Sequence, residues 1–340
     1  MMKIKAKKRT GLGIIGGIIG LIVVVLVAGM LWYTSALKPV DTTDVARERF
    51  DVEKGLSTEQ IANDLQQQGF IRNSFAYQIH AKLSSSGVQA GTHMISPSLS
   101  SQEIAKKLSM AETDEISVTI PPGLMLGELR DVFKKYGYSD AEITAAYGKK
   151  YTNAVLADKP ASADLEGYIF PETYNVFATD DLSILLSKSF DELERRLQAD
   201  DAFAKFENNG LSTFEAVTLA SIVQQEVPDP VDQKKVAGVF YNRLADNSWL
   251  GSDATFVFAA KKLGVTPSPM LDSPYNTRLY KGLPPGPIAN MNFSALAAVA
   301  DPIRSDYNYF VSGDDGTTYF AVTEAEHLEN VAKFCTKLCQ

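Results

Sequence analysis

Cysteine and histidine are scarce in this chain of 340 residues, which contains two cysteines and three histidines. Two cysteines are too few for the disulfide-dense scaffolds of small secreted proteins. Cys335 and Cys339 lie four residues apart, a spacing compatible with a local disulfide or with two incidental thiols. The histidines show no metal-ligand spacing with them, and no GxSxG or Walker loop is present, so we expect neither a metal nor a cofactor.

Positive charge is also scarce outside one short segment. The formal net charge is −8, from 33 Lys and Arg against 41 Asp and Glu. Residues 1–11 hold five of the basic side chains and no acid, so the remaining chain carries −13 without those five. An acidic surface repels nucleic-acid phosphates, and no basic stripe reverses this charge. We therefore expect no nucleic-acid partner.

One long apolar run follows the basic segment, over residues 12–33. A helix of this length extends roughly 33 Å, the thickness of a bilayer's hydrocarbon core. Trp32 and Tyr33 close the run, where interfacial aromatic residues are common. A cleaved signal peptide would have a shorter apolar region and a small-x-small site. The sequence therefore predicts a cytoplasmic stub (1–11), a retained single-pass helix in the cell membrane and an extracytoplasmic remainder.

Two similar segments follow a polar stalk predicted over 34–48. LSTEQIANDL (56–65) matches LSSQEIAKKL (99–108), each with a serine in position to cap a helix and with Ile and Leu on one face. Each follows a strand-like stretch, which indicates a strand–helix unit used twice in a small α+β module over 49–115. The module has two interpretations, a glycan-binding role or a packing spacer.

The rest of the chain, 116–340, is predicted to be a larger α+β domain. A strand over 116–120 ends at a Pro-Pro-Gly turn, and helical patterns follow at about 125–137, 139–148 and 180–198. The segment 211–227 then opens with a capping box, Ser212 and Glu215, and is followed by Pro228. Because proline cannot continue a regular helix, we expect this helix to end near Glu226.

An acidic residue at a helix C-terminus is disfavoured by the helix dipole. The effect is about 0.3–1 kcal/mol, roughly 0.2–0.7 pKa unit, too little to keep Glu226 protonated at neutral pH. Partial burial would have to raise its pKa further, as in lysozyme. From the helix alone, a solvated glutamate is the simpler interpretation. Polar and Pro/Gly-rich loops downstream are either stiff surface loops or the wall of a polysaccharide cleft, in which Tyr275 stacks on a sugar and Asn276 and Asp253 bind hydroxyls.

Six segments carry a resemblance to a known family: LEGYIFPETY (165–174), LASIVQQE (219–226), FYNRL (240–244), SDAT (252–255), SPYNT (273–277) and GLPPGPI (282–288). In this order they resemble the motifs of the endolytic murein transglycosylase, or YceG-like, family. The similarity covers about 165–334 and extends to the anchor and to a LysM-like module. An acid common two positions before the catalytic one is Gln224 here, which singles out Glu226.

The resemblance implies cleavage of the β-1,4 bond between N-acetylmuramic acid and N-acetylglucosamine in nascent peptidoglycan. It implies that Glu226 protonates the departing oxygen and then, as base, activates the muramic acid 6-hydroxyl, which leaves a 1,6-anhydro end. The motifs also supply candidate substrate-binding residues: Glu166, Tyr168, Gln225, Asn242, Asp253, Thr255, Tyr275, Asn276, Thr277 and Pro285.

Two other functions remain open from the sequence. A muramidase that uses water would need a second carboxylate, for which Glu166 and Asp253 are candidates. A non-catalytic glycan-binding scaffold of the wall-synthesis machinery would use Glu226 only structurally. The expected partners are peptidoglycan glycan strands, and the resemblance suggests work beside peptidoglycan synthases and division or elongation proteins.

Overall fold

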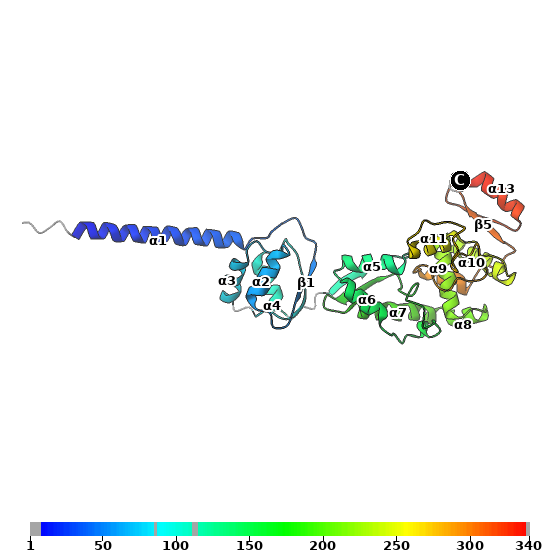
Figure 1. The fold of residues 1–340 in the computed structure, drawn as a ribbon, viewed down its shortest axis with the longest axis horizontal. Helices are drawn as coiled ribbons and strands as arrows, with labels where there is room; N and C mark the ends of the chain where they lie inside the picture. Colours follow the sequence, from blue (N-terminus) through cyan, green and yellow to red (C-terminus); the bar gives the residue numbers. More distant parts are fainter. Residues whose placement is uncertain (1–7, 85–86, 111–114, 338–340) are drawn as a thin grey trace, which may run out of the picture. The chain divides into compact units, whose positions relative to one another are not determined.

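The computed structural model describes residues 8–84, 87–110 and 115–337 (Figure 1). The chain divides into two compact units, and each is described by itself. Unit 1 comprises residues 1–116 with 177–179, and unit 2 comprises residues 117–176 with 180–340. Helices and short two-stranded sheets alternate along the chain, so the predicted α+β class is confirmed.

Unit 1 begins with the long helix α1 (Lys8–Ala36). Its segment Gly17–Ala36 has 20 residues, a mean hydropathy of 2.3 and no burial within the protein. An exposed apolar helix of this length is suited to cross a bilayer, and an N-terminal signal sequence has the same character. At both of its ends, α1 extends beyond the predicted apolar run of 12–33.

The segment after α1 lies against the rest of unit 1. Leu37 is only 4% exposed, and its carbonyl accepts a hydrogen bond from the Ser101 amide at 3.0 Å. Arg72 Nε donates to the Pro39 carbonyl at 2.7 Å. The beginning of the predicted stalk therefore packs on the module.

The module consists of β1 (Glu48–Val52), α2 (Thr58–Gln67), α3 (Ser74–Leu83), β2 (Gly91–Ile95) and α4 (Ser101–Ser109). β1 and β2 pair antiparallel, with Phe50 opposite His93. Both predicted serine caps are confirmed, because Ser57 and Ser100 form capping boxes at the starts of α2 and α4. The core joins both helices to the strands through Phe50, Leu65, Phe70, Tyr77, Ile95, Ile104 and Leu108. Whether this module is LysM-like stays a prediction.

β3 (Glu115–Thr119) crosses from unit 1 into unit 2 and pairs with β4 (Thr173–Phe177), whose last residue belongs to unit 1. Between them in the sequence lie α5 (Leu126–Lys135), α6 (Asp140–Gly148) and the 3-10 turn η1 (Ala154–Leu156). The helices α7 (Leu182–Ala199) and α8 (Ala202–Asn208) follow. All of the helices predicted in this region are present, with ends that differ by a few residues.

The second half of unit 2 is built around α9 (Thr213–Glu226), α10 (Pro230–Ala245) and α12 (Phe293–Ala300), which pack on one another. Their contact surfaces are fully buried: Val217, Leu219, Val236, Val239, Phe240, Leu296 and Val299. α11 (Asp253–Leu263) also packs on α9. The chain ends with the antiparallel hairpin β5 (Tyr309–Ser312) and β6 (Thr318–Ala321), which α13 (Glu324–Phe334) covers.

Candidate active site

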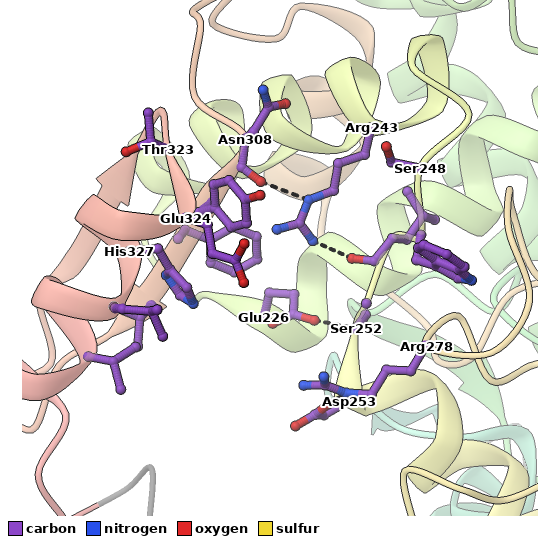
Figure 2. Close-up of a pocket in the computed structure, with 18 of the residues that line it drawn as sticks. Glu226, Arg243, Ser248, Ser252, Asp253, Arg278, Asn308, Thr323, Glu324 and His327 are labelled. Carbon is purple, nitrogen blue, oxygen red and sulfur yellow. Dashed lines mark hydrogen bonds and ion pairs between the residues drawn. The ribbon is translucent and has the colours of Figure 1, made fainter.

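Glu226 lies in the wall of a cavity of about 1080 Å³ within unit 2. One side of the cavity is formed by the end of α10, the loop before α11 and the start of α11. The opposite side is formed by β5 and α13, which we call the C-terminal wall. Figure 2 shows Glu226 between Ser252 on the first side and His327 and Glu324 of α13 on the other.

The carboxylate sits there because α9 ends at that point. Ser212 caps the first turn through the predicted capping box with Glu215, and Glu226 is the last helical residue. The backbone of Val227 is extended, with φ −144°, and Pro228 follows. Since a residue before proline is biased away from helical conformation, the helix stops where Glu226 can turn into the cavity.

The surroundings of Glu226 raise its pKa above the usual value of 4.5. Burial is the largest cause, because it disfavours the charged carboxylate. The Ser252 hydroxyl, which donates to Oε1, opposes that rise, whereas the charge of Asp253 adds to it. Among the described residues Oε2 has no hydrogen-bond partner. Glu226 therefore has the properties of a proton donor with one oxygen free for a ligand.

Ser252 holds its position through two buried threonines. It is the N-cap residue of α11, yet its side chain makes no capping bond and instead reaches Glu226. Its amide donates to Thr277 Oγ1 at 3.0 Å, and its carbonyl accepts from Thr255 Oγ1 at 2.7 Å. The two threonine hydroxyls lie 3.0 Å apart. This buried network fixes the hydroxyl that bonds the carboxylate.

Arg243, near the end of α10, connects the two sides of the cavity. Its Nη1 donates to the Leu250 carbonyl at 2.5 Å, and its Nε donates to the Asn308 carbonyl at 2.8 Å. The guanidinium also lies over the ring of Tyr309, 5.7 Å from its centroid. Because a guanidinium is planar and offers several donors, it can hold two backbone segments at once.

An aromatic stack forms part of the C-terminal wall. The rings of Tyr309 and His327 lie 5.4 Å apart at an angle of 24°. The buried Nδ1 of His327 has no partner within the described part of the chain. Burial, and next the nearby Arg243, lower the pKa of His327 below 6.5. A neutral imidazole, which can donate or accept a hydrogen bond, thus faces the cavity at neutral pH.

Comparison with known proteins identifies the family of the chain. A sequence profile of the YceG-like family matches residues 50–333. The chain belongs to the YceG-like family. The match includes Glu226, the module of unit 1 and most of the C-terminal wall.

Similar proteins come from Bacillus subtilis, Streptococcus pneumoniae and Listeria monocytogenes. A Bacillus subtilis protein named endolytic murein transglycosylase is 28% identical over 327 residues, which cover 89% of each chain. A Streptococcus pneumoniae protein of the same name is 26% identical over 340 residues, which cover 90% of this chain. The match spans only 61% of that relative's length. A crystal structure of a yceG-like protein from Listeria monocytogenes covers 83% of this chain and 98% of its own, with 28% identity and a TM-score of 0.51.

Of the ten predicted substrate-binding residues, only Asp253 lines the cavity with Glu226. Asp253 is exposed and forms an ion pair with Arg278, which also lines the cavity. Thr255 and Thr277 support Ser252, as described above. Asn242 donates to the carbonyls of Ser305 and Tyr307 and so holds the segment that leads into β5.

Three predicted residues, Glu166, Tyr168 and Gln225, lie outside the cavity lining. Glu166 is 6% exposed and accepts from the Leu126 amide at 2.9 Å, at the start of α5. Tyr168 is fully buried. Gln225 is exposed, and its amide donates to the Gly123 carbonyl at 2.8 Å. In this structure each contacts protein rather than the cavity.

The remaining three lie in the loops between α11 and α12. Asn276 is buried and donates to the carbonyls of Pro269 and Leu271, which shapes its own loop. The Tyr275 ring packs 4.8 Å from that of Phe258. Pro285 is exposed. Their roles in substrate binding stay predictions.

Sequence reasoning missed most residues of the cavity, among them Arg243, Ser252, Tyr309 and His327. Arg243 and Ser252 lie inside motifs that the sequence analysis had singled out, beside Asn242 and Asp253. Their place in these motifs could therefore have identified them as candidate site residues. Tyr309 and His327 carry no such signal, because they meet Glu226 only through the packing of the C-terminal wall.

Cys335 also lines the cavity and is disulfide-bonded, which resolves one open alternative for this cysteine. Cys339 lies outside the described residues. Within the described ranges no group of three or more His, Cys, Asp or Glu side chains could hold a metal ion.

Proposed function

We propose that this YceG-like protein is an endolytic lytic transglycosylase of peptidoglycan, with Glu226 as its single general acid and base. The observation that carries the proposal is a partly buried glutamate with a raised pKa and one free oxygen, in a cavity large enough for a ligand. The relatives named endolytic murein transglycosylase support the substrate class. The chain spans about three fifths of the first relative's length, so the activity of the whole protein is part of the proposal.

The first step is proton donation. Glu226 starts protonated, because burial disfavours its carboxylate. Its proton goes from the unbonded Oε2 to the oxygen that links N-acetylmuramic acid to N-acetylglucosamine. The bond from that oxygen to the anomeric carbon breaks, and N-acetylglucosamine leaves with the proton as a new hydroxyl.

The second step closes a ring. The Glu226 carboxylate accepts the proton of the muramic acid 6-hydroxyl, whose oxygen bonds to the anomeric carbon and forms the 1,6-anhydro sugar. The Ser252 hydroxyl stabilises the carboxylate between the two steps, because it donates to Oε1. The proton returns to Glu226, so the enzyme is regenerated without water.

The side chains around Glu226 are suited to bind sugars. Trp249, 52% exposed, and the Tyr309–His327 stack offer flat apolar faces at the cavity. The exposed carboxylate of Glu324 can bond hydroxyl or amide groups. We assign these residues to glycan binding in addition to the predicted Asp253.

The proposal includes the location. α1 anchors the chain in the cell membrane, with the N-terminus cytoplasmic and both units beyond α1 extracytoplasmic, because five basic residues precede the apolar run. The module of unit 1 is proposed to be LysM-like, as glycan binder or spacer. Glycan strands are the proposed partner, and peptidoglycan synthases and division or elongation proteins are proposed neighbours.

A muramidase is the second candidate, because Asp253 and Glu324 also line the cavity. An inverting hydrolase would use one of them to activate water. Asp253 is paired with Arg278, whereas no hydrogen bond or ion pair of the Glu324 side chain is seen in the described structure. Glu324 is therefore the carboxylate to test beside Glu226.

Product analysis by mass spectrometry tests the proposal. The full chain in detergent is incubated with purified glycan strands in water enriched in heavy oxygen. We expect 1,6-anhydro ends without heavy oxygen, and loss of about 10²–10⁴-fold in rate for Glu226→Gln. Glu324→Gln is the matched control in the same cavity and should keep the anhydro product.

Each opposite outcome has a meaning. Heavy oxygen at reducing ends, together with inactive Glu324→Gln, would establish the muramidase. A folded wild-type chain that binds strands and cleaves none would establish the scaffold function.

A further inference from the structure

The helix α3 of unit 1 has apolar side chains on two faces. Ala76, Tyr77 and Ala81 are buried in the module core. Phe75, Ile79 and Leu83 lie on another face; we call them the outer α3 stripe. Their spacing of four residues places them along one side of the helix. Phe75 is 62% exposed, Leu83 is 75% exposed and Ile79 is half-buried, so the described residues leave most of this apolar side uncovered.

The outer α3 stripe begins beside the end of α1. The rings of Phe75 and Trp32 lie 6.4 Å apart. Next to this pair, the Tyr33 hydroxyl of α1 and Nδ1 of His80 in α3 share a hydrogen bond of 3.5 Å. The chain then enters the module directly, because Leu37 is already buried. These contacts fix the position of the outer α3 stripe along the axis of α1.

We propose that the outer α3 stripe lies in the interfacial layer of the membrane that α1 crosses. The inference rests on the proposed anchoring by α1. Tryptophan at the end of a spanning helix sits at the headgroup level, and Phe75 contacts Trp32. A surface helix buries its apolar side at this boundary. Lipid is therefore the partner that covers this side of α3.

The charges near the stripe fit the same surface. Lys82 is exposed one position before Leu83, and Arg72 is exposed before the start of α3. Long basic side chains at this depth place their stems among apolar groups and their heads at lipid phosphates. Because the stripe continues from the end of α1, a partner protein there would have to displace lipid headgroups. The continuity with α1 therefore favours lipid.

Fluorescence quenching by brominated lipids tests the depth of the stripe. The full chain is reconstituted in vesicles of phosphatidylcholine and phosphatidylglycerol, with bromines either near the headgroups or near the chain ends. Phe75→Trp is studied with Trp32→Phe and Trp249→Phe, so that position 75 carries the only tryptophan. The matched control is Met110→Trp in the same background, because Met110 is exposed and apolar but lies outside the stripe. Circular dichroism checks that both variants keep the wild-type fold.

We expect loss of fluorescence at position 75 with bromines near the headgroups, less with deep bromines, and none at position 110. Trp32 is measured separately in a Trp249→Phe chain. If Trp32 is quenched but the tryptophan at position 75 is not, the inference about the stripe is overturned and the proposed anchor stands. Equal quenching at positions 75 and 110 would also overturn it. No quenching of Trp32 would refute the anchoring itself.

Discussion

At the scale of single residues, the Ser252 hydroxyl opposes the effect of burial on the pKa of Glu226. Ser252 stands at the N-cap of α11, where serine normally bonds a backbone amide, but its hydroxyl bonds the carboxylate instead. A hydrogen bond to a charged acceptor typically contributes about 1.5–3 kcal/mol. This bond stabilises the ionised form and limits how far burial raises the pKa.

We predict that Ser252→Ala moves the pH dependence of the enzyme. Loss of the hydroxyl destabilises the carboxylate and raises the pKa of Glu226 further. Because the first step needs protonated Glu226, the falling limb of kcat/KM against pH should move to higher pH. Ser248→Ala, in the same cavity, is the control and should leave the profile unchanged. A shift toward lower pH would contradict the assigned role.

Burial also raises the pKa of Glu166, which lies outside the cavity and bonds the protein backbone. Burial raises its pKa to about 8, although the Leu126 amide opposes the rise. Below pH 4.5 the carboxyl is protonated in both the folded and the unfolded chain, so it does not affect the free energy of unfolding. Between pH 4.5 and pH 8 only the unfolded chain ionises it, so the folded state loses stability as pH rises through this range.

We predict that Glu166→Gln stabilises the chain increasingly between pH 5 and pH 8, the range set by the pKa of about 8. The glutamine oxygen still accepts from Leu126, and the buried charge is gone. Thermal unfolding across this range measures the difference in Tm. In Glu128 burial is outweighed by the Met125 amide and Lys261, which lower the pKa, so Glu128→Gln should lose stability above pH 4.5. Equal slopes for both variants would contradict the prediction.

At the scale of elements, α10 is shaped to let another segment pass close to it. A Cβ at Gly238 would lie 2.2 Å from the Ile303 carbonyl oxygen. The Ile303 amide donates to the Lys234 carbonyl at 3.0 Å, and Asn242 holds the same segment further along. This segment leads into β5, so α10 positions the C-terminal wall as well as Arg243.

We predict that Gly238→Ala destabilises the protein by about 1–3 kcal/mol, the usual cost of overpacking. The displaced segment should also lower activity, because it carries β5 and with it Tyr309. Gly127→Ala is the matched control. Gly127 lies in α5, where an added Cβ would meet no atom within 4 Å beyond its chain neighbours and its own helix, so alanine there should stabilise by about 0.5–1 kcal/mol. Chemical denaturation measures both, and a neutral Gly238→Ala would refute the close contact.

At the scale of the whole molecule, the apolar helix decides where the protein works. A membrane anchor remains on the mature chain, whereas a signal sequence is removed. Trp32 contacts Phe75 and Tyr33 bonds His80, so cleavage after α1 would remove contacts that the module makes with this helix.

We therefore predict that the protein isolated from bacterial membranes retains α1. Intact-mass spectrometry of a C-terminally tagged chain measures this. Arginine at both Val24 and Val25, in the middle of the helix, should abolish insertion, since each central charge costs about 2.5–3.5 kcal/mol. A shortened chain in the soluble extracytoplasmic fraction would show that α1 is a signal sequence.

Much of the local structure could be predicted from the sequence, because it depends on neighbours in the chain. The capping boxes at Ser57, Ser100 and Ser212 each need only a partner three residues later. The end of α9 follows from Pro228. The motifs around Glu226 were sufficient to nominate it.

The chemistry of the site was decided by the tertiary structure. The helix dipole alone leaves Glu226 ionised, and only burial among segments far apart in the chain raises its pKa substantially. The fold places most of the predicted substrate-binding residues in contact with protein outside the cavity lining, and it brings Tyr309 and His327 to the cavity. Sequence spacing determines which residues share a helix, whereas desolvation depends on which segments pack together, and that requires the fold.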